Sequence, residues 1–154
     1  MLSEEIHQEV QSAIDSAPTP GAACLDVLRI VQSHFGWISD ELLRDVADLL
    51  GMTPEEVDSR STFYNHIYRK PVGRHIVLVC DSITCWIMGY ESILGHLIRR
   101  LGVEIGGTTK DNRFTVLPIQ CLGACDRAPA IMIDGDLHGD LTPQKVDSIL
   151  ENYP

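Results

Sequence analysis

The sequence predicts an α+β protein in which a bundle of helices precedes a small mixed sheet. Over roughly the first 60 residues, apolar side chains recur at the spacing of amphipathic helices. Beyond that point, short β-branched runs alternate with helical patterns, which is typical of strands and helices that share one sheet. The composition, 44% hydrophobic and 22% charged, is ordinary for a globular protein. We therefore expect a helical domain over residues 1–70 and a second domain over residues 71–154.

Cap and stop signals divide the first domain into four helices. The segment Pro18-Thr19-Pro20-Gly21 ends the first helix. Ser39 is a suitable N-cap for the third helix, and Gly51 is a suitable stop. The segment Thr53-Pro54-Glu55-Glu56 combines a capping box with a proline at the first helical position. The expected helices span residues 3–17, 22–33, 39–50 and 54–61.

An aromatic and apolar stretch joins the two domains. It contains Phe63, Tyr64, Ile67 and Tyr68, and it ends in a linker turn at Arg69-Lys70-Pro71-Val72-Gly73. Two interpretations of these side chains are open: contact with a partner chain, or a core that joins the two domains. Acidic residues outnumber basic ones more strongly before this stretch than after it, which supports a domain boundary here.

The second domain alternates between strand and helix patterns. Its strands are expected over residues 75–79, 114–119, 130–133 and 136–138, and its helices over residues 87–101 and 142–152. Asp134-Gly135 is a hairpin signal between the last two strands. This order suggests a thioredoxin-like sheet, with the first two strands parallel and the hairpin antiparallel.

Four cysteines follow the first two strands of this domain in two pairs. Cys80 and Cys85 come directly after the first strand, and Cys121 and Cys125 come directly after the second. If these strands are parallel neighbours, the loops that follow them emerge at the same edge of the sheet. The four thiols are then expected to converge on one site.

The spacing of the cysteines leaves three kinds of site open. Four thiolates form structural zinc sites, although such sites usually combine tighter C-x-x-C pairs. A [2Fe–2S] cluster takes two cysteines on each iron, and the wider loops here suit its larger size. Thiol–disulfide chemistry favours a C-x-x-C motif at a helix start, which the sequence lacks. The spacing therefore favours the cluster, with zinc and disulfides as alternatives.

Four motifs around the cysteines are distinctive. They are Arg74-His75-Ile76-Val77, Cys80-Asp81-Ser82-Ile83-Thr84-Cys85-Trp86, Cys121-Leu122-Gly123-Ala124-Cys125-Asp126-Arg127-Ala128-Pro129 and Leu141-Thr142-Pro143. At these motifs the chain resembles a known family, the small [2Fe–2S] subunit of bacterial NADH:quinone oxidoreductase (the E subunit of respiratory complex I). The resemblance extends upstream to Ser61-Thr62-Phe63-Tyr64 and to residues 22–37, and so it spans nearly the whole chain.

This resemblance implies a helical N-terminal domain, a thioredoxin-like [2Fe–2S] ferredoxin domain, and one cluster on Cys80, Cys85, Cys121 and Cys125. It also implies docking on a larger flavoprotein subunit that carries FMN, the NADH site and a [4Fe–4S] cluster, among further subunits of complex I. The chain would exchange single electrons with that FMN and would not be catalytic alone. The same subunit type recurs in NAD-linked formate dehydrogenases and hydrogenases, which is one alternative. A structural zinc-binding scaffold is an alternative of a different class.

Charge and hydropathy exclude several other functions. The formal net charge of −10 argues against nucleic acid as a partner. No apolar run approaches the roughly 20 residues of a membrane span, and the N-terminus shows no secretory signal. We expect a cytoplasmic protein without direct membrane insertion, bound peripherally on the cytoplasmic side of the inner membrane as part of its complex.

Other candidate residues are weaker. The six histidines show no paired ligand spacing, and no G-x-G-x-x-G motif follows a strand, so nicotinamide is expected only on the partner subunit. Cys24 lies in a helical pattern and is expected to be a buried small hydrophobe. Trp86 and Met88 are expected in the core, although shielding of a cluster is an alternative role.

Overall fold

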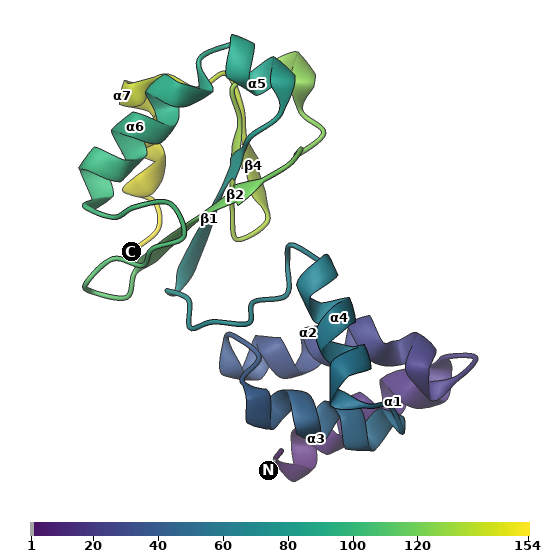
Figure 1. Cartoon of the computed structure of the whole chain (residues 1–154). Coiled ribbons are helices and arrows are strands. Elements are labelled where there is room, and N and C mark those ends of the chain that lie inside the picture. Colours follow the sequence, from purple (N-terminus) through teal and green to yellow (C-terminus); the bar gives the residue numbers. More distant parts are fainter. Residues whose placement is uncertain (1) are drawn as a thin grey trace. The chain divides into compact units, whose positions relative to one another are not determined.

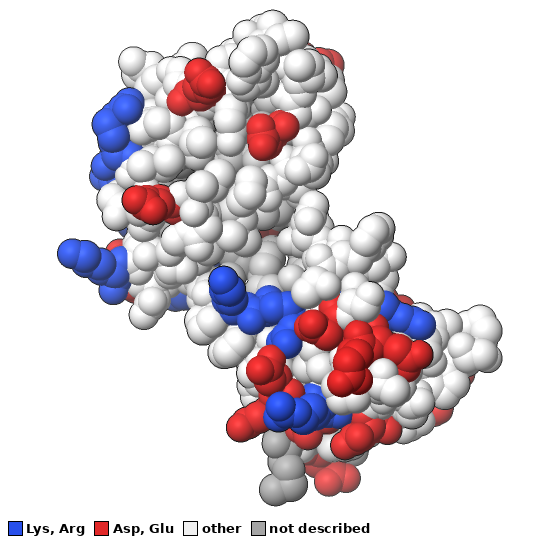
Figure 2. Space-filling view, viewed as in Figure 1, with Lys and Arg blue, Asp and Glu red and all other residues white. Residues whose placement is uncertain are grey.

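A computed structural model describes residues 2–154; residue 1, which the expected helical domain includes, lies outside the described residues. The chain forms two compact units, one through Pro71 and one from Val72 onward (Figure 1). We describe each unit by itself. Figure 2 shows acidic side chains crowded on the visible face of the helical unit and sparse on that of the second unit.

Three of the four α-helices in the first unit begin at a residue whose side chain caps the helix. The Ser39 side chain accepts a hydrogen bond from the Leu42 N–H at 3.2 Å. Thr53 and Glu56 form a complete capping box, in which each side chain accepts from the backbone of the other. Such caps satisfy the first N–H groups of a helix, which otherwise lack partners. The elements are α1 (Glu4–Ser16), a 3₁₀ turn η1 (Pro20–Ala23), α2 (Cys24–Phe35), α3 (Asp40–Leu50) and α4 (Pro54–Phe63).

The core of this unit lies between the apolar faces of its helices. Its fully buried centre includes Val27, Leu28, Val31, Val46 and Val57. Val27, Leu28 and Val31 recur at helical spacing on α2, and Val46 of α3 and Val57 of α4 face the same interior. The helical bundle expected from the sequence is therefore confirmed.

Arg69 secures the chain where it leaves the helical unit. Its Nε donates to Asp58 at 2.7 Å and its Nη2 donates to Asp40 at 2.7 Å. Its Nη1 also donates to the carbonyl oxygen of Ile38. A guanidinium that spans two carboxylates and a backbone oxygen in this way ties α3 and α4 to the exit of the chain.

The second unit contains one four-stranded sheet in the order β2-β1-β3-β4. Strands β1 and β2 are parallel, whereas β3 is antiparallel to both β1 and β4. Helices α6 and α7 pack together on one side of the sheet (Figure 1). This arrangement confirms the α+β fold class and the predicted strand directions. The elements are β1 (His75–Cys80), α5 (Ile83–Ile87), α6 (Tyr90–Leu101), β2 (Phe114–Ile119), a 3₁₀ turn η2 (Cys125–Arg127), β3 (Ile131–Ile133), β4 (Asp136–His138) and α7 (Pro143–Leu150).

The first helix of this unit differs from the sequence prediction. A single helix is expected over residues 87–101, but the chain forms two helices, α5 and α6, separated at Gly89. Gly89 has a φ of 108°, which a residue with a side chain rarely adopts. The glycine therefore interrupts the helical pattern and sets a separate turn of helix soon after β1. Within residues 2–154, no helix is long and apolar enough to cross a membrane.

Tyr153 at the end of the chain makes the stability of this unit sensitive to alkaline pH. Its hydroxyl donates to Asp136 Oδ2 at 3.0 Å and lies 3.0 Å from His138 Nε2. Burial, reinforced by the bond to Asp136 and the charges of Asp136 and Asp134, raises the pKa of Tyr153 from 10.0 to about 12. The folded state thus binds the phenol proton more tightly than the unfolded state does. The stabilisation is complete below pH 10 and is lost as the pH rises toward 12.

We predict that Tyr153→Phe flattens this alkaline loss of stability. Urea unfolding at several pH values between about 8 and 12 should show the wild type losing more free energy of unfolding above about pH 10 than the variant does. The variant lacks the phenol whose proton is bound, so its curve should follow only the other titrating groups. Parallel curves for the two proteins would contradict the role assigned to Tyr153.

Candidate metal centre

The parallel pairing of β1 and β2 brings the two cysteine pairs to one edge of the sheet. Cys80 is the last residue of β1, and it pairs with Ile119, the last residue of β2. The Asp81 N–H donates to the Ile119 carbonyl oxygen at 2.8 Å, so the pairing continues just past the end of β1. Cys121 follows Ile119 by two residues and therefore begins its loop beside Cys80.

The second member of each pair lies on a short helical turn. Cys85 lies within α5, and Cys125 begins η2. Cys80 and Cys85 are buried, whereas Cys121 and Cys125 are exposed. Ala124, Ala128 and Ala130 pack with the two buried cysteines in a small apolar cluster. The site thus has an inner pair of thiols against the sheet and an outer pair toward solvent.

The four thiols are mutual neighbours. The thiol of Cys85 hydrogen-bonds with Cys80 and lies near Cys125, and burial is the main cause that raises its pKa to about 11. The thiol of Cys121 hydrogen-bonds with both Cys80 and Cys125. Each of the outer cysteines therefore interacts with a cysteine of the other pair, as the strand arrangement leads us to expect.

Gly123 makes the most direct backbone contact with a thiol of the site. Its N–H donates to Cys121 Sγ at 3.3 Å, and this bond is the main cause that lowers the pKa of Cys121. Gly123 has a φ of 74°, a conformation that favours glycine. The loop between Cys121 and Cys125 is therefore shaped so that a backbone donor stabilises negative charge on sulfur.

The donor set fits a centre that prefers sulfur ligands. All five cysteines lie in the described part of the chain and are free, and thiolates are the ligands that iron–sulfur clusters and zinc favour. Within residues 2–154, no three His, Cys, Asp or Glu side chains are arranged to hold a single metal ion. What supports a shared centre is thus the chemistry of four thiols and their contacts with one another.

An apolar surface beside the cysteines is not predicted by the sequence. Trp86 and Met88 are expected in the core, but they are 55% and 57% exposed, so that prediction is wrong. Ile83 and Ile87 are also exposed, at 67% and 69%. On a helix as short as α5, turning Cys85 inward forces its neighbours outward. The helical spacing around Cys85 is the signal that could have revealed this apolar patch.

Two of the three histidines of the sheet unit pair with carboxylates, and the third, His138, lies 3.0 Å from the Tyr153 hydroxyl. His75 Nδ1 lies 2.6 Å from Asp134 Oδ2, and His96 Nε2 lies 2.9 Å from Asp147 Oδ1. His75 is at the start of β1, which is the end of the strand opposite Cys80. These contacts assign the two histidines to pairs with acidic side chains of the sheet and helices.

Cys24 belongs to the helical unit and has a different environment. It is buried, as expected. Burial raises the pKa of its thiol, while the nearby Arg60 guanidinium, which also hydrogen-bonds with it, opposes the shift. Cys24 therefore lies in the other unit from the four cysteines of the candidate site.

Known proteins resemble this chain along nearly its whole length. The E subunit of the NADH-quinone oxidoreductase of Pseudomonas aeruginosa is 44% identical over 153 residues, covering 99% of this chain and 92% of the relative. The E subunit of the Escherichia coli oxidoreductase is 41% identical over 152 residues, with the same coverage of both chains.

A solved structure shares the fold. The NAD⁺-reducing [NiFe]-hydrogenase in its H₂-reduced state contains a chain that matches 88% of this one with a TM-score of 0.73 and 24% sequence identity. This chain spans only 22% of that hydrogenase chain. The thioredoxin-like [2Fe–2S] ferredoxin family matches residues 10–154. The chain thus belongs to the thioredoxin-like [2Fe–2S] ferredoxin family, alongside the E subunits of bacterial NADH-quinone oxidoreductases.

Proposed function

We propose that the chain holds one [2Fe–2S] cluster on Cys80, Cys85, Cys121 and Cys125 and is the electron-transfer subunit of an NADH-quinone oxidoreductase. The cluster supplies a centre that accepts and donates one electron at a time. The observation that carries the proposal is the convergence of four free thiols at the shared edge of β1 and β2. The family match over residues 10–154 supports the same cofactor.

The partner in this proposal is a flavoprotein subunit that binds FMN and NADH. NADH gives up its two electrons together as a hydride, and a flavin can pass them on singly to a neighbouring one-electron centre. The chain's part is to present its sulfur-bound centre to that flavin. Further subunits link the pair to the cytoplasmic side of the inner membrane, so this chain needs no membrane span of its own.

The protein residues around the thiols tune and shield the centre. The inner sulfurs of Cys80 and Cys85 are covered by the alanines of the apolar cluster, which keeps water from that side. The Gly123 N–H, already directed at Cys121 Sγ, stabilises added negative charge on the ligand sulfur and so raises the reduction potential.

The exposed apolar patch on α5 is the docking surface for the flavoprotein in this proposal. Ile83, Trp86, Ile87 and Met88 lie next to the buried Cys85 in the sequence, on α5 and at its C-cap, and all four are exposed. Large exposed apolar groups that lie together on a surface mark interaction sites, and tryptophan is among the residues that contribute most to binding. A partner bound here lies against the helix that carries Cys85.

We predict that replacing any of the four proposed ligands with alanine abolishes a stable cluster. Anaerobically purified wild type should contain about two irons and two sulfides per chain and show an EPR signal after reduction. Cys80→Ala, Cys85→Ala, Cys121→Ala and Cys125→Ala should lose most of both, while Cys24→Ala should keep them. Full iron and sulfide in a ligand variant, or zinc in a colourless wild type, would overturn the proposed cofactor site.

Gly139 lies so close to the loop of Cys125 that a side chain at this position would have no room. A Cβ atom at this position would lie 2.5 Å from Arg127 Cβ and 2.6 Å from the Arg127 carbonyl oxygen. The Asp140 N–H donates to that same oxygen at 2.5 Å. The segment before α7 therefore fits tightly against η2, the turn that begins with Cys125.

We predict that Gly139→Ala displaces η2 and weakens cluster retention. The added methyl should lower the free energy of unfolding by about 1–3 kcal/mol, as overpacking does, and iron should be lost faster to a chelator. Gly21→Ala is the matched control, because its Cβ would meet only ordinary contacts at 3.5 Å or more. Equal chelation rates in both variants and wild type would show that this contact does not hold the site.

We predict that Trp86→Ser weakens binding to the flavoprotein subunit at least about tenfold, as expected of a hot-spot residue. Isothermal titration of the cluster-loaded chain with the purified flavoprotein subunit would measure the Kd. Leu137→Ser, an exposed apolar residue on β4, should change the Kd by less than about twofold, since scattered surface apolar residues contribute little. Unchanged binding by Trp86→Ser would remove α5 from the interface.

A further inference from the structure

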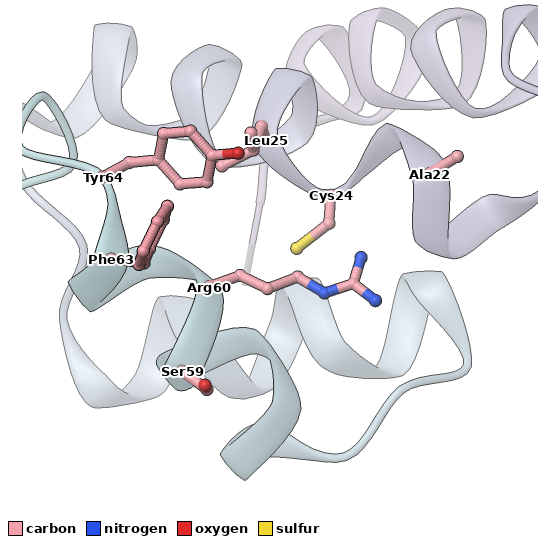
Figure 3. Close-up of a pocket in the computed structure, with 7 residues that line it drawn as sticks. All are labelled: Ala22, Cys24, Leu25, Ser59, Arg60, Phe63 and Tyr64. Carbon is pink, nitrogen blue, oxygen red and sulfur yellow. The ribbon is translucent and has the colours of Figure 1, made fainter.

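A groove in the helical unit has the composition of a binding site. It lies between the start of α2 and the end of α4 and has a volume of about 480 Å³ (Figure 3). Its walls are largely apolar, with a single guanidinium among them. The lining residues are Ala22, Cys24, Leu25, Ser59, Arg60, Phe63 and Tyr64.

Two exposed aromatic side chains border the groove and do not belong to the hydrophobic core. Phe63 is 78% exposed and Tyr64 is 45% exposed. Their rings pack edge to face, with centroids 5.3 Å apart, so each helps to hold the other in place. Val57 and Ile67, on either side of them in the sequence, are the residues that enter the core. The aromatic pair therefore presents a fixed apolar surface to the groove.

Arg60 is positioned for a carboxylate. Its Nη1 donates to the Gly21 carbonyl oxygen at 2.5 Å, and Figure 3 shows its guanidinium beside Cys24 at the groove. The charge of Glu56, one helical turn earlier, also acts on Arg60, although Glu56 Oε2 accepts from the Thr53 N–H at 2.9 Å in the capping box. Arg60 also hydrogen-bonds with the Cys24 thiol. A guanidinium has five N–H donors, so the N–H groups that remain are preorganised to pair with an incoming carboxylate.

Large exposed apolar residues gather at two places in the chain, at this groove and on α5. Among the described residues, the large exposed apolar side chains gather at 63–64 and at 83–88, while Phe35, Ile105 and Leu137 occur singly. A stable subunit interface usually takes about 20–30 residues from each side, and α5 has five. An interface that holds this chain on a partner therefore extends beyond α5, and the groove is the other place where large exposed apolar groups gather.

We propose that the groove is a second docking site for the flavoprotein subunit, and that it takes a segment presenting an aliphatic or aromatic side chain next to a carboxylate. The apolar side chain lies against Phe63, Tyr64 and Leu25, and the carboxylate pairs with Arg60. This inference rests on the proposed function, because it takes the flavoprotein as the partner. Two attachment points on one partner raise the overall affinity well above that of either alone.

The test is isothermal titration of the cluster-loaded chain with the purified flavoprotein subunit. Phe63→Ser and Arg60→Gln should each raise the Kd about tenfold or more. Their matched controls are Phe35→Ser, an exposed aromatic at the end of α2, and Arg44→Gln, an exposed arginine on α3. The controls should change the Kd by less than about twofold, as is usual away from the centre of an interface. Phe63→Ser tests the groove even if Arg60→Gln fails to fold.

Hydrogen exchange locates the contact independently. Addition of the flavoprotein should slow amide exchange over residues 59–64 in the wild type and should do so less in Phe63→Ser. Wild-type affinity for Phe63→Ser, or exchange over 59–64 that does not change, would overturn the second site. If the groove is filled by the other unit of the same chain, Phe63→Ser will alter exchange in the free chain and leave the Kd unchanged, which also overturns it.

Failure of this inference is distinguishable from failure of the proposed function. If Trp86→Ser weakens binding and Phe63→Ser does not, the flavoprotein remains the partner and only the groove is excluded. If the wild type fails to bind the flavoprotein, both the partner and the groove site fail. Iron and sulfide content measured on the same samples ensures that every variant is compared with its cluster present.

Discussion

The parallel pairing of β1 with β2 is the constraint on which the cysteine site depends. Each strand is six residues long, which is about 20 Å at the usual rise per residue. If the same two strands ran antiparallel, the segments that follow them would start about that far apart, and the two cysteine pairs would lie at opposite ends of the sheet. The register that pairs Cys80 with Ile119 instead starts both loops at one place.

Contacts from the antiparallel half of the sheet hold this site in shape. The Cys80 N–H donates to the Ala130 carbonyl oxygen at 3.2 Å, so the segment before β3 covers the inner side of the site. The segment that follows β4 fits against η2 at Gly139. The two parallel strands thus bring the thiols together, and the hairpin that follows fixes the loop of Cys125. The cysteine site therefore depends on the whole sheet, although only four residues form it.

The sequence predicted what depends on local pattern and missed what depends on tertiary contact. The β-branched run before Cys80 and the caps at Ser39 and Thr53 are local signals, and the strands and helices formed where these signals lie. The sequence prediction misplaces Trp86 because hydrophobicity alone does not say which side of a short helix faces inward. The tight approach of Gly139 to Arg127 has no local signal either, because it arises from two segments that only the folded sheet brings together.

Apolar side chains that stay exposed add little to the stability of the free chain. Burying a large apolar side chain such as phenylalanine contributes about 1.5–3 kcal/mol, most of which Phe63 and Trp86 forgo while the chain is alone. Both units complete their cores without these side chains. In the proposed function, this free energy is released when the partner covers these side chains. A subunit built this way keeps its own fold and still offers a surface for a larger partner, and binding there would hold the proposed centre beside α5 at a constant distance from a flavin.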